Sequence, residues 1–422
     1  MKTIWLIYPY GNLPGSGILE TRQLRYGRAL VKQGYRVIWW MSNYSHFSKN
    51  FLSEGWKKIK VDSYLYIELV PSTSYKKNIS FERIISELNY AKNLNKAINS
   101  SEVKRPDLII TSGTGMSSAF WPIWPYMNKK NIPVVYDIMD ITMFDTYIGN
   151  KSKALIPFGK IVSNVMKFRE NNFYRHVSAI CGLGKYQVEY AVQRTGRPSI
   201  PNCLLYNSRR VGNFRQEMQL DLPHEIIKKL PRKDKEELWC VYAGSLGPSY
   251  DIDGLIGASK IADERKARIK FIVAGMGPEE KRLKEAAATI NNLFFLGKID
   301  SDYLPGLYSK CDVGLCTYGP FSTVDMPDKF YDYTASGLAM VSSLKGESIE
   351  HTLKAHAGLQ YQAGDSMDLY NKIIEIRNNL DVYKKNSYNL AMQFDFDLKL
   401  KDFIALIDEC VHGAVKNYSR ID

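Results

Sequence analysis

Short apolar runs alternate along the chain with longer stretches in which apolar residues follow a helical spacing. The apolar runs have the length of strands and are rich in β-branched and aromatic residues. They lie at residues 3–9, 35–42, 107–113, 132–138, 178–184 and 201–207, and again at 238–244, 270–275, 292–297, 312–318, 339–344 and 358–362. Continuous apolar runs are typical of parallel strands that are buried on both faces and joined by helices. The pattern predicts an α/β protein with two doubly wound sheets.

A polar stretch separates the two series of predicted strands. Residues 208–237 are charged, contain two prolines and include no run of strand character. We therefore expect an N-terminal Rossmann-like domain over residues 1–210 and a second one over residues 211–395. The remaining residues, 396–422, carry apolar side chains at helical spacing, which predicts a terminal amphipathic helix.

The excess of basic over acidic residues favours some classes of binding partner over others. The chain has 422 residues and a formal net charge of +13, which favours anionic partners such as phosphorylated ligands or an acidic membrane face. The cations are spread along the chain, without a concentrated basic stripe or a recognisable nucleic-acid-binding motif. We therefore expect no nucleic-acid partner.

The placement of cysteine and histidine argues against a metal site. The six cysteines form no CxxC pair, and the six histidines form no HxxxH motif. Cys311 and Cys316 lie inside an apolar segment, where a cysteine usually behaves as a small buried hydrophobe. We predict no structural or catalytic metal and no cofactor.

Hydropathy predicts a cytoplasmic protein. The apolar part of residues 1–12 is too short for a secretory signal and fits a buried strand. No apolar run approaches the roughly 18 residues that a membrane-spanning helix requires. Two segments, 120–130 and 151–176, interleave apolar residues with basic ones, which is compatible with peripheral contact to an anionic membrane. The alternative is an ordinary amphipathic helix packed against the core.

Several loops at predicted strand ends could approach a ligand. In doubly wound sheets, ligands bind at the carboxyl ends of strands, where glycine lets backbone N–H groups come close to a phosphate. The candidate residues are Gly15 and Gly17 after the first strand, and Ser245, Gly247, Gly275, Gly277 and Ile299 after three strands of the second series. Tight structural turns are the alternative for these glycine loops.

The stretch DMPDKFYDYTASG, residues 325–337, adds two charges to the same edge. Pro327 suits the start of a helix and Gly337 suits its end, so a short helix is predicted. Lys329 then lies in the first turn, against the helix dipole, with Asp332 one turn later on the same face. The pair predicts a ligand above the start of the helix. The alternative is a solvent-exposed lysine that pairs with Asp332.

The order of these motifs resembles the donor domain of retaining glycosyltransferases of family 4, glycosyl transferases group 1. The resemblance is carried by YAGSLG, VAGMGPEEKRL, FLGKI, PDKFYDYTASGLAMVSS and GLQYQAGD, and in the first half by YDIMD and LLYNS. It implies the GT-B fold, in which two Rossmann-like domains face each other across a cleft and a C-terminal helix packs back toward the first. It also implies a nucleotide-diphosphate sugar as donor and a saccharide or polyprenyl-linked acceptor.

The resemblance also implies roles for individual residues. Asp332 matches the second of two acidic positions in the family, where the carboxylate holds the ribose hydroxyls. The first acidic position falls at Val324, and Asp325 is one residue out of register. The loop that supplies an arginine and a lysine in many members has neither here, so Lys329 is expected to hold the diphosphate and the nucleobase is expected near Ile299. Front-side attack with retention needs no separate nucleophile and no metal.

For catalysis, Lys329 is expected to stabilise the leaving diphosphate, and Asp137 or Asp140 to orient the acceptor hydroxyl. Capping of the following segment is the alternative for both aspartates. The combined prediction is a retaining, metal-independent hexosyltransferase of bacterial surface polysaccharide or glycolipid biosynthesis. A non-catalytic subunit that binds sugar nucleotides is an alternative because of Val324, and a sugar-nucleotide epimerase of the same fold is another.

Overall fold

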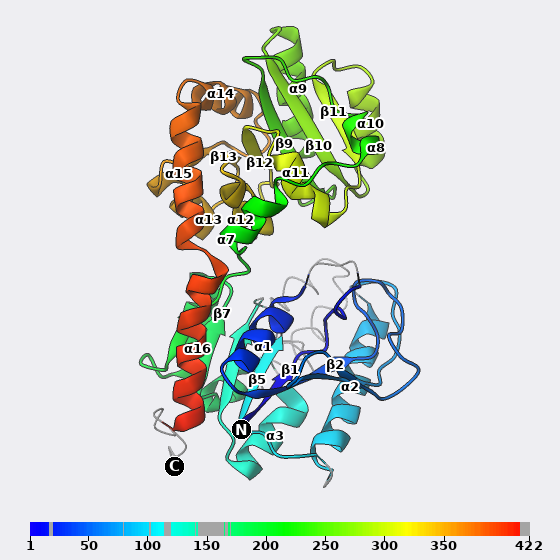
Figure 1. Ribbon diagram of the computed structural model, residues 1–422, viewed down its shortest axis with the longest axis vertical. Coiled ribbons are helices and arrows are strands. Elements are labelled where there is room, and N and C mark those ends of the chain that lie inside the picture. The colour runs from blue at the N-terminus through cyan, green and yellow to red at the C-terminus, as the bar shows by residue number, and fades with distance from the viewer. Residues whose placement is uncertain are drawn as a thin grey trace. The chain divides into compact units, whose positions relative to one another are not determined.

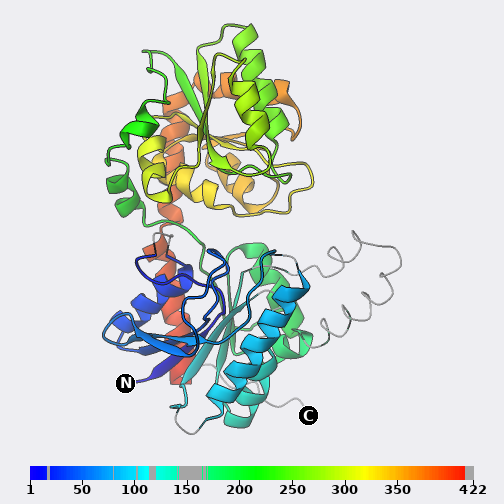
Figure 2. The same ribbon diagram turned by 90° about the vertical axis from the view of Figure 1, so that its right-hand side faces the viewer.

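The chain forms two compact units, each built on a mainly parallel sheet with helices packed on it (Figures 1 and 2). The computed structural model describes residues 1–16, 20–78, 80–100, 103–113, 120–139, 141, 164, 168 and 170–413. Unit 1 comprises Met1–Leu205 and the residues from Leu400 onward, and unit 2 comprises Tyr206–Lys399. The predicted class, α/β with two Rossmann-like sheets, is confirmed.

The sheet of unit 1 has eight strands in the order β3-β4-β2-β1-β5-β6-β7-β8. All neighbours run parallel except β3 and β4. The strands are β1 (Thr3–Ile7), β2 (Arg36–Ser42), β3 (Lys57–Lys60), β4 (Leu65–Val70), β5 (Leu108–Gly113), β6 (Val134–Ile138), β7 (Ala179–Gly182) and β8 (Asn202–Leu204). Strands β1 and β6 are buried along their whole length, which explains their unbroken apolar sequences.

Two strands at one edge of this sheet were not predicted. Strand β3 reads KKIK and is mostly exposed, so it carries no apolar run. Strand β4 alternates buried and half-buried residues over its first four positions, because an antiparallel edge is only partly covered. A search for continuous apolar runs therefore misses both strands.

The helices of unit 1 pack an aromatic core against its sheet. They are α1 (Arg22–Lys32), α2 (Phe81–Ile98), α3 (Phe120–Lys130) and α6 (Lys185–Thr195). The ring centroid of Trp5 lies 5.3 Å from that of Trp40 and 5.6 Å from that of Tyr126. Ile123 and Met127 of α3 are buried in the same core. Segment 120–130 is thus a packed amphipathic helix, which favours the alternative to membrane contact. Most of segment 151–176 lies outside the described residues.

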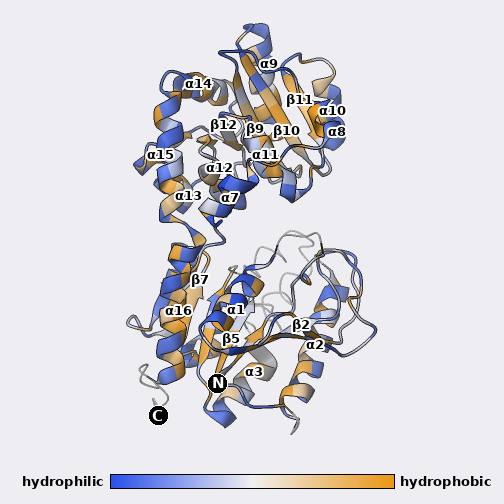
Figure 3. Cartoon of the chain, in the orientation of Figure 1, coloured by the Kyte–Doolittle hydropathy of each residue, from blue (hydrophilic) through white to orange (hydrophobic). Residues whose placement is uncertain are grey.

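The sheet of unit 2 has six strands, all parallel, in the order β11-β10-β9-β12-β13-β14. The strands are β9 (Leu238–Ser245), β10 (Ile269–Met276), β11 (Leu293–Gly297), β12 (Val313–Cys316), β13 (Ala339–Ser342) and β14 (Gly358–Gln360). Figure 3 shows the apolar residues of this unit gathered in the central strands β9 and β10. Every strand predicted for the second half is present.

Helices cover both faces of the sheet of unit 2. They are α7 (Val211–Glu217), α8 (His224–Ile227), α9 (Ile252–Glu264), α10 (Glu280–Ala287), α11 (Leu304–Tyr308), α12 (Asp328–Ser336), α13 (Glu347–Lys354), α14 (Ser366–Arg377) and α15 (Leu380–Gln393). Asp251 and Asp365 cap the starts of α9 and α14 by accepting hydrogen bonds from backbone N–H groups of the first turn. These caps fix where the helices begin after their loops.

Helix α16 (Phe396–His412) starts in unit 2, and its residues from Leu400 belong to unit 1. Within unit 1, the ring centroid of Phe403 lies 5.0 Å from that of Tyr26, and Tyr35 donates a hydrogen bond to Asp408. The apolar residues from which the sequence predicts this helix therefore form the face that packs against the rest of unit 1.

Candidate functional site

The loops after β9 and β10 meet at the carboxyl edge of the sheet of unit 2. The backbone N–H of Leu246 donates to the carbonyl of Met276 at 3.0 Å. A Cβ atom on Gly275 would overlap the carbonyl oxygen of Gly244, and one on Gly277 would overlap that of Leu246. The close approach of the two loops therefore requires these glycines, which supports the structural alternative for Gly275 and Gly277.

The other predicted residues of this edge are at least partly exposed to solvent. Ser245 is exposed at the end of β9, and Gly247 is half-buried two residues later, with no atom within 4 Å of the position of a Cβ. Ile299 is half-buried just beyond β11, the strand next to β10. Parallel neighbours present their carboxyl ends together, so all three residues share one edge.

Helix α12 runs from Asp328 to Ser336, and Gly337 after it is in the left-handed conformation with φ of 71°, as its sequence predicts. Lys329 lies in the first turn and is only 8% exposed. Its ammonium nitrogen lies 4.8, 4.7 and 5.4 Å from the ring centroids of Tyr242, Tyr250 and Tyr318. The three rings come from β9, the loop after β9 and the segment that follows β12, so the fold assembles an aromatic cage around one cation.

Within the described part of the chain, the ammonium of Lys329 makes no hydrogen bond or ion pair, and burial lowers its pKa. It lies at a helix N-terminus, whose dipole disfavours a cation. The nearby carboxylates of Asp328 and Asp332 act against burial without outweighing it. An anion placed above the helix start would therefore offset the remaining cost of the buried cation. The alternative of an exposed lysine paired with Asp332 is wrong, because Lys329 is buried and Asp332 has another partner.

That partner is Arg209, a residue that sequence reasoning missed. Its Nε donates to Oδ1 of Asp332 at 2.6 Å, and both side chains are largely buried. Burial alone would lower the pKa of the Arg209 guanidinium, but the Asp332 carboxylate outweighs burial and raises it. The ion pair therefore fixes one oxygen of Asp332. The only signal in the sequence is the arginine pair of SRR at residues 208–210.

Asp325 does not replace the carboxylate that the family has at the position of Val324. Val324 is 39% exposed, and Asp325 accepts the backbone N–H of Glu347 at 2.5 Å at the start of α13. Burial raises the pKa of Asp325, and the nearby carboxylates of Glu347 and Glu350 add to this against the lowering effect of that N–H. Asp325 thus serves α13 as an N-terminal cap.

A pocket of about 480 Å³ opens beside the aromatic cage of unit 2. Its walls include Gly319, Ser343, Lys345 and Tyr361. The hydroxyl of Ser343 accepts a hydrogen bond from the backbone N–H of Tyr318 at 2.7 Å, which joins the pocket wall to one ring of the cage. The pocket is large enough for a sugar ring.

In unit 1, the structure places the predicted catalytic Asp137 in the core. Asp137 is fully buried, pairs with Arg22 at 2.6 Å and accepts a hydrogen bond from Ser112 at 2.9 Å. These surroundings favour a structural role, and the predicted catalytic role stays a prediction. Gly15 is exposed with φ of 77°, typical of a turn. Gly17 and Asp140 lie outside the described residues.

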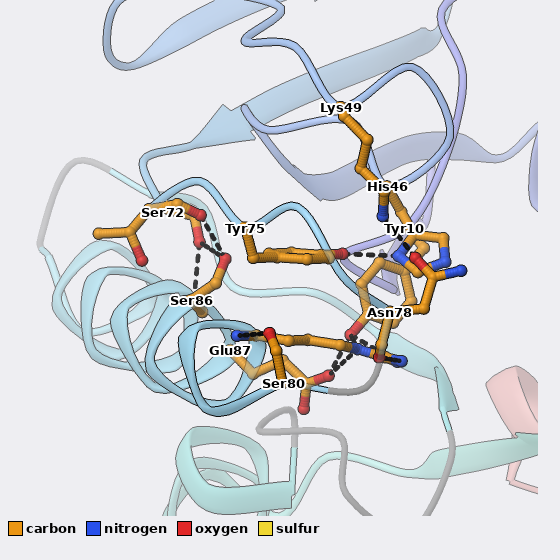
Figure 4. Close-up of polar contacts among 11 residues, drawn as sticks. Tyr10, His46, Lys49, Ser72, Tyr75, Asn78, Ser80, Ser86 and Glu87 are labelled. Carbon is orange, nitrogen blue, oxygen red and sulfur yellow. Dashed lines mark hydrogen bonds and ion pairs between the residues drawn. The ribbon is translucent and has the colours of Figure 1, made fainter.

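The carboxyl ends of β1, β2 and β4 carry a polar cluster that was not predicted (Figure 4). Nδ1 of His46 and the hydroxyl of Tyr75 lie 2.6 Å apart. Burial, with the neighbouring cations Lys49 and Arg83, lowers the pKa of His46 to about 4. Lys49 lies over the ring of Tyr75 and donates to Asn78 at 2.6 Å. The cluster therefore ties the loop after β2 to the segment that precedes α2.

Two further findings concern metals and membranes. The described residues contain no group of three or more histidine, cysteine, aspartate or glutamate side chains able to hold a metal ion. Among the same residues, no helix combines the length and the hydrophobicity needed to cross a bilayer.

Comparison with known proteins identifies the second half of the chain. Residues 237–379 match the family model of glycosyl transferases group 1. The matched range contains Ser245, Lys329 and Asp332 but not Arg209. The matched range lies within unit 2, so this unit resembles the family that its motifs predict.

Relatives extend the likeness beyond that domain. The chain is 24% identical over 302 residues to chitobiosyldiphosphodolichol beta-mannosyltransferase from Candida glabrata, a match that covers 62% of this chain and 64% of the relative. The chain thus spans less than two thirds of that relative. Sucrose-phosphate synthase from Thermosynechococcus elongatus superposes with a TM-score of 0.68 at 14% identity, over 98% of this chain and 100% of that one. Anabaena HepE in complex with UDP-glucose gives 0.62 at 16% identity, over 97% and 100%. These likenesses show the GT-B fold.

Proposed function

We propose that the chain is a glycosyltransferase that moves a sugar from a nucleotide-diphosphate donor to a saccharide or polyprenyl-linked acceptor. The observation that carries the proposal is the buried ammonium of Lys329, which lies at the start of α12 in a group 1 domain and makes no ion pair with a described residue. A diphosphate is the kind of anion that this position would hold.

In the proposed reaction, the diphosphate is the leaving group and gains negative charge as the bond to the sugar breaks. Lys329, the hydroxyl of Ser245 and the backbone N–H of Gly247 stabilise that charge without a metal ion. Asp332, held by Arg209 through Oδ1, binds the ribose hydroxyls with Oδ2. The acceptor attacks from the same face, the departing phosphate takes its proton, and the anomeric configuration is retained.

The acceptor side of the proposal rests on a relative. The mannosyltransferase from Candida glabrata bears the name of a diphosphodolichol acceptor, a lipid-linked sugar. A polyprenyl-linked acceptor for this chain would require work at an anionic membrane face, which suits the net charge of +13. The proposal includes a place in bacterial surface polysaccharide or glycolipid synthesis at the cytoplasmic side of the membrane, which the resemblance of the motifs implies.

The test is a screen of the purified chain against UDP-, GDP-, ADP- and CMP-sugars with EDTA present. We expect one sugar nucleotide to raise the melting temperature of the chain and to be hydrolysed slowly, which releases the free nucleotide. Lys329→Ala should abolish both effects. Lys385→Ala, an exposed lysine of the same unit, is the control. NMR of the product reports whether the anomeric configuration is retained.

Other outcomes of the screen separate the alternatives. Binding without turnover, with any acceptor supplied, would identify a non-catalytic subunit, in line with valine at position 324. Conversion of the donor into its epimer without transfer would identify an epimerase. Absence of binding by every sugar nucleotide would refute the proposed donor site.

A further inference from the structure

Helix α2 of unit 1 exposes an apolar stripe on the side away from the core. Phe81, Ile84, Ile85 and Leu88 are 72%, 38%, 40% and 48% exposed, at the spacing i, i+3, i+4 and i+7. Such spacing places the four side chains side by side on one helical face. In Figure 2, α2 is the light-blue helix at the front of unit 1. Single exposed apolar residues are ordinary, whereas four in one stripe indicate a contact surface.

The opposite face of α2 already packs on the core. Tyr90, Leu94 and Ile98 are buried, so the helix is held without help from the stripe. The N-terminus of the helix is capped by Ser80, whose hydroxyl accepts the backbone N–H of Arg83 at 3.2 Å. The stripe is therefore presented by a helix that is capped at its start and packed on the core along its other face.

Lysines flank the stripe at both ends. Lys76 and Lys77 precede it and are exposed. Lys92 and Lys96 continue the same face toward the end of the helix and are exposed as well. Of the two carboxylates of α2, Glu87 is buried and bonded to Arg83, which leaves Glu82 as the exposed one. The face is thus apolar at its centre and cationic at its ends.

The loop after β2 lies against the same region. The hydrogen bond from Lys49 to Asn78 ties it to the segment that carries Lys76 and Lys77 (Figure 4). This loop exposes Phe47 and Phe51, each 52% exposed. Apolar side chains from two connected segments are therefore open to solvent at one end of unit 1.

We propose that the stripe of Phe81, Ile84, Ile85 and Leu88 inserts into the headgroup region of an anionic membrane, with the flanking lysines against the lipid phosphates. A second copy of the chain suits the surface poorly, because a two-fold contact would bring the lysines of both copies together. An anionic bilayer accepts the apolar side chains and complements the lysines. The inference locates the membrane contact of the proposed function and rests on that part of it, whereas the donor site can be tested without lipid.

The experiment is flotation of the full chain with vesicles of phosphatidylcholine alone and of phosphatidylcholine and phosphatidylglycerol in equal parts. We expect binding to the anionic vesicles only. The variant Phe81→Ser, Ile85→Ser, Leu88→Ser should lose at least about tenfold in affinity, since a buried apolar side chain typically contributes more than this factor. Lys76→Gln with Lys77→Gln should weaken binding roughly fivefold per lysine and reduce its sensitivity to salt.

The control replaces three exposed apolar residues of unit 2, Leu220, Val382 and Met392, with serine, and should bind vesicles as the wild type does. Binding of sugar nucleotides should be unchanged in all of these variants, so a failure here is distinct from a failure of the donor site. Equal vesicle binding by the stripe variant and the wild type would overturn the proposal. So would a dimer in solution that the stripe variant dissociates, or no vesicle binding by the wild type.

Discussion

A methyl group added to Gly244 would lie 2.5 Å from the ammonium nitrogen of Lys329. The lysine side chain thus occupies the space that a side chain on the β9 loop would fill. The end of β9 and the first turn of α12 are far apart in sequence, yet they pack closely here because the residue on β9 is a glycine. The ammonium group can lie among the three tyrosine rings because Gly244 has no side chain.

The variant Gly244→Ala should displace Lys329 from its cage. We expect an unfolding free energy lower by about 1–2 kcal/mol, because the new methyl group crowds the lysine and the backbone is strained for alanine at φ of 149°. Affinity for the donor should fall about tenfold or more, measured by calorimetry. Gly212→Ala is the control, because no atom lies within 4 Å of its Cβ position and alanine suits helix α7. Unchanged donor affinity in Gly244→Ala would contradict a role for Lys329.

Replacement of Lys329 by methionine should stabilise the chain in the absence of ligand while destroying donor binding. Burial lowers the pKa of Lys329, so the unfolded chain binds this proton more tightly than the folded chain. Wild-type stability should therefore rise with pH from the lowered pKa up to the ordinary value near 10.5, and Lys329→Met should lack that rise. At neutral pH we expect a gain of about 1 kcal/mol or more in chemical denaturation. A loss of stability would mean that the tyrosine cage outweighs the cost of burial.

The ion pair between Arg209 and Asp332 can be tested by a double-mutant cycle. The cycle combines Arg209→Met with Asp332→Leu, and Asp332→Leu alone should cost about 3 kcal/mol of unfolding free energy, because it removes the ion-pair partner of the largely buried Arg209. The double variant Arg209→Met, Asp332→Leu should recover most of this loss. Donor affinity separates the two functions of the carboxylate: a ribose contact predicts a larger loss in Asp332→Asn than in Arg209→Gln. Equal losses would assign Asp332 a structural role alone.

His46 should make unit 1 sensitive to mild acid. Burial and the neighbouring Lys49 and Arg83 lower its pKa from 6.5 to about 4, so between these values the unfolded chain binds a proton that the folded chain does not. The unfolding free energy should be highest above pH 6.5, where His46 is neutral in both states, and should fall as the pH drops toward 4. Since His46 is only half-buried, we expect about 1 kcal/mol. The slope should vanish in His46→Gln, which can still bond Tyr75. Titration of His46 near 6.5 by NMR would contradict this.

The central strands could be predicted because their residues are buried on both faces. Strands such as β1 and β9 carry unbroken apolar sequences, and the spacing of 396–412 indicates the terminal helix. Strands β3 and β4 could not be predicted in this way. Strand β3 is mostly exposed and carries lysines, and its neighbour β4 alternates buried with half-buried residues, so neither has a continuous apolar run. Division of the chain into units near residue 205 depends on tertiary contacts, which a polar stretch marks only approximately.

The candidate site was predictable in part. Pro327 and Gly337 give the bounds of α12, and hence the place of Lys329 in its first turn. The surroundings of Lys329 are set by tyrosines at positions 242, 250 and 318, which only the sheet order brings together. Local spacing suggests Asp332 as the partner of Lys329, but Arg209, distant in sequence, takes that place. The sequence therefore predicts which residues lie together within one helical turn, but it does not predict contacts between residues of different elements.

Helix α16 also has a consequence for the order in which the protein can be completed during synthesis. Phe403, Ile407 and Cys410 are buried, and the residues from Leu400 belong to unit 1. On the ribosome, unit 1 is made first but lacks this helix until the last stretch emerges, whereas all of unit 2 has been made by residue 399. A nascent chain that stops before residue 400 would therefore hold a whole unit 2 and leave part of the core of unit 1 uncovered, so the first unit translated is the last to close.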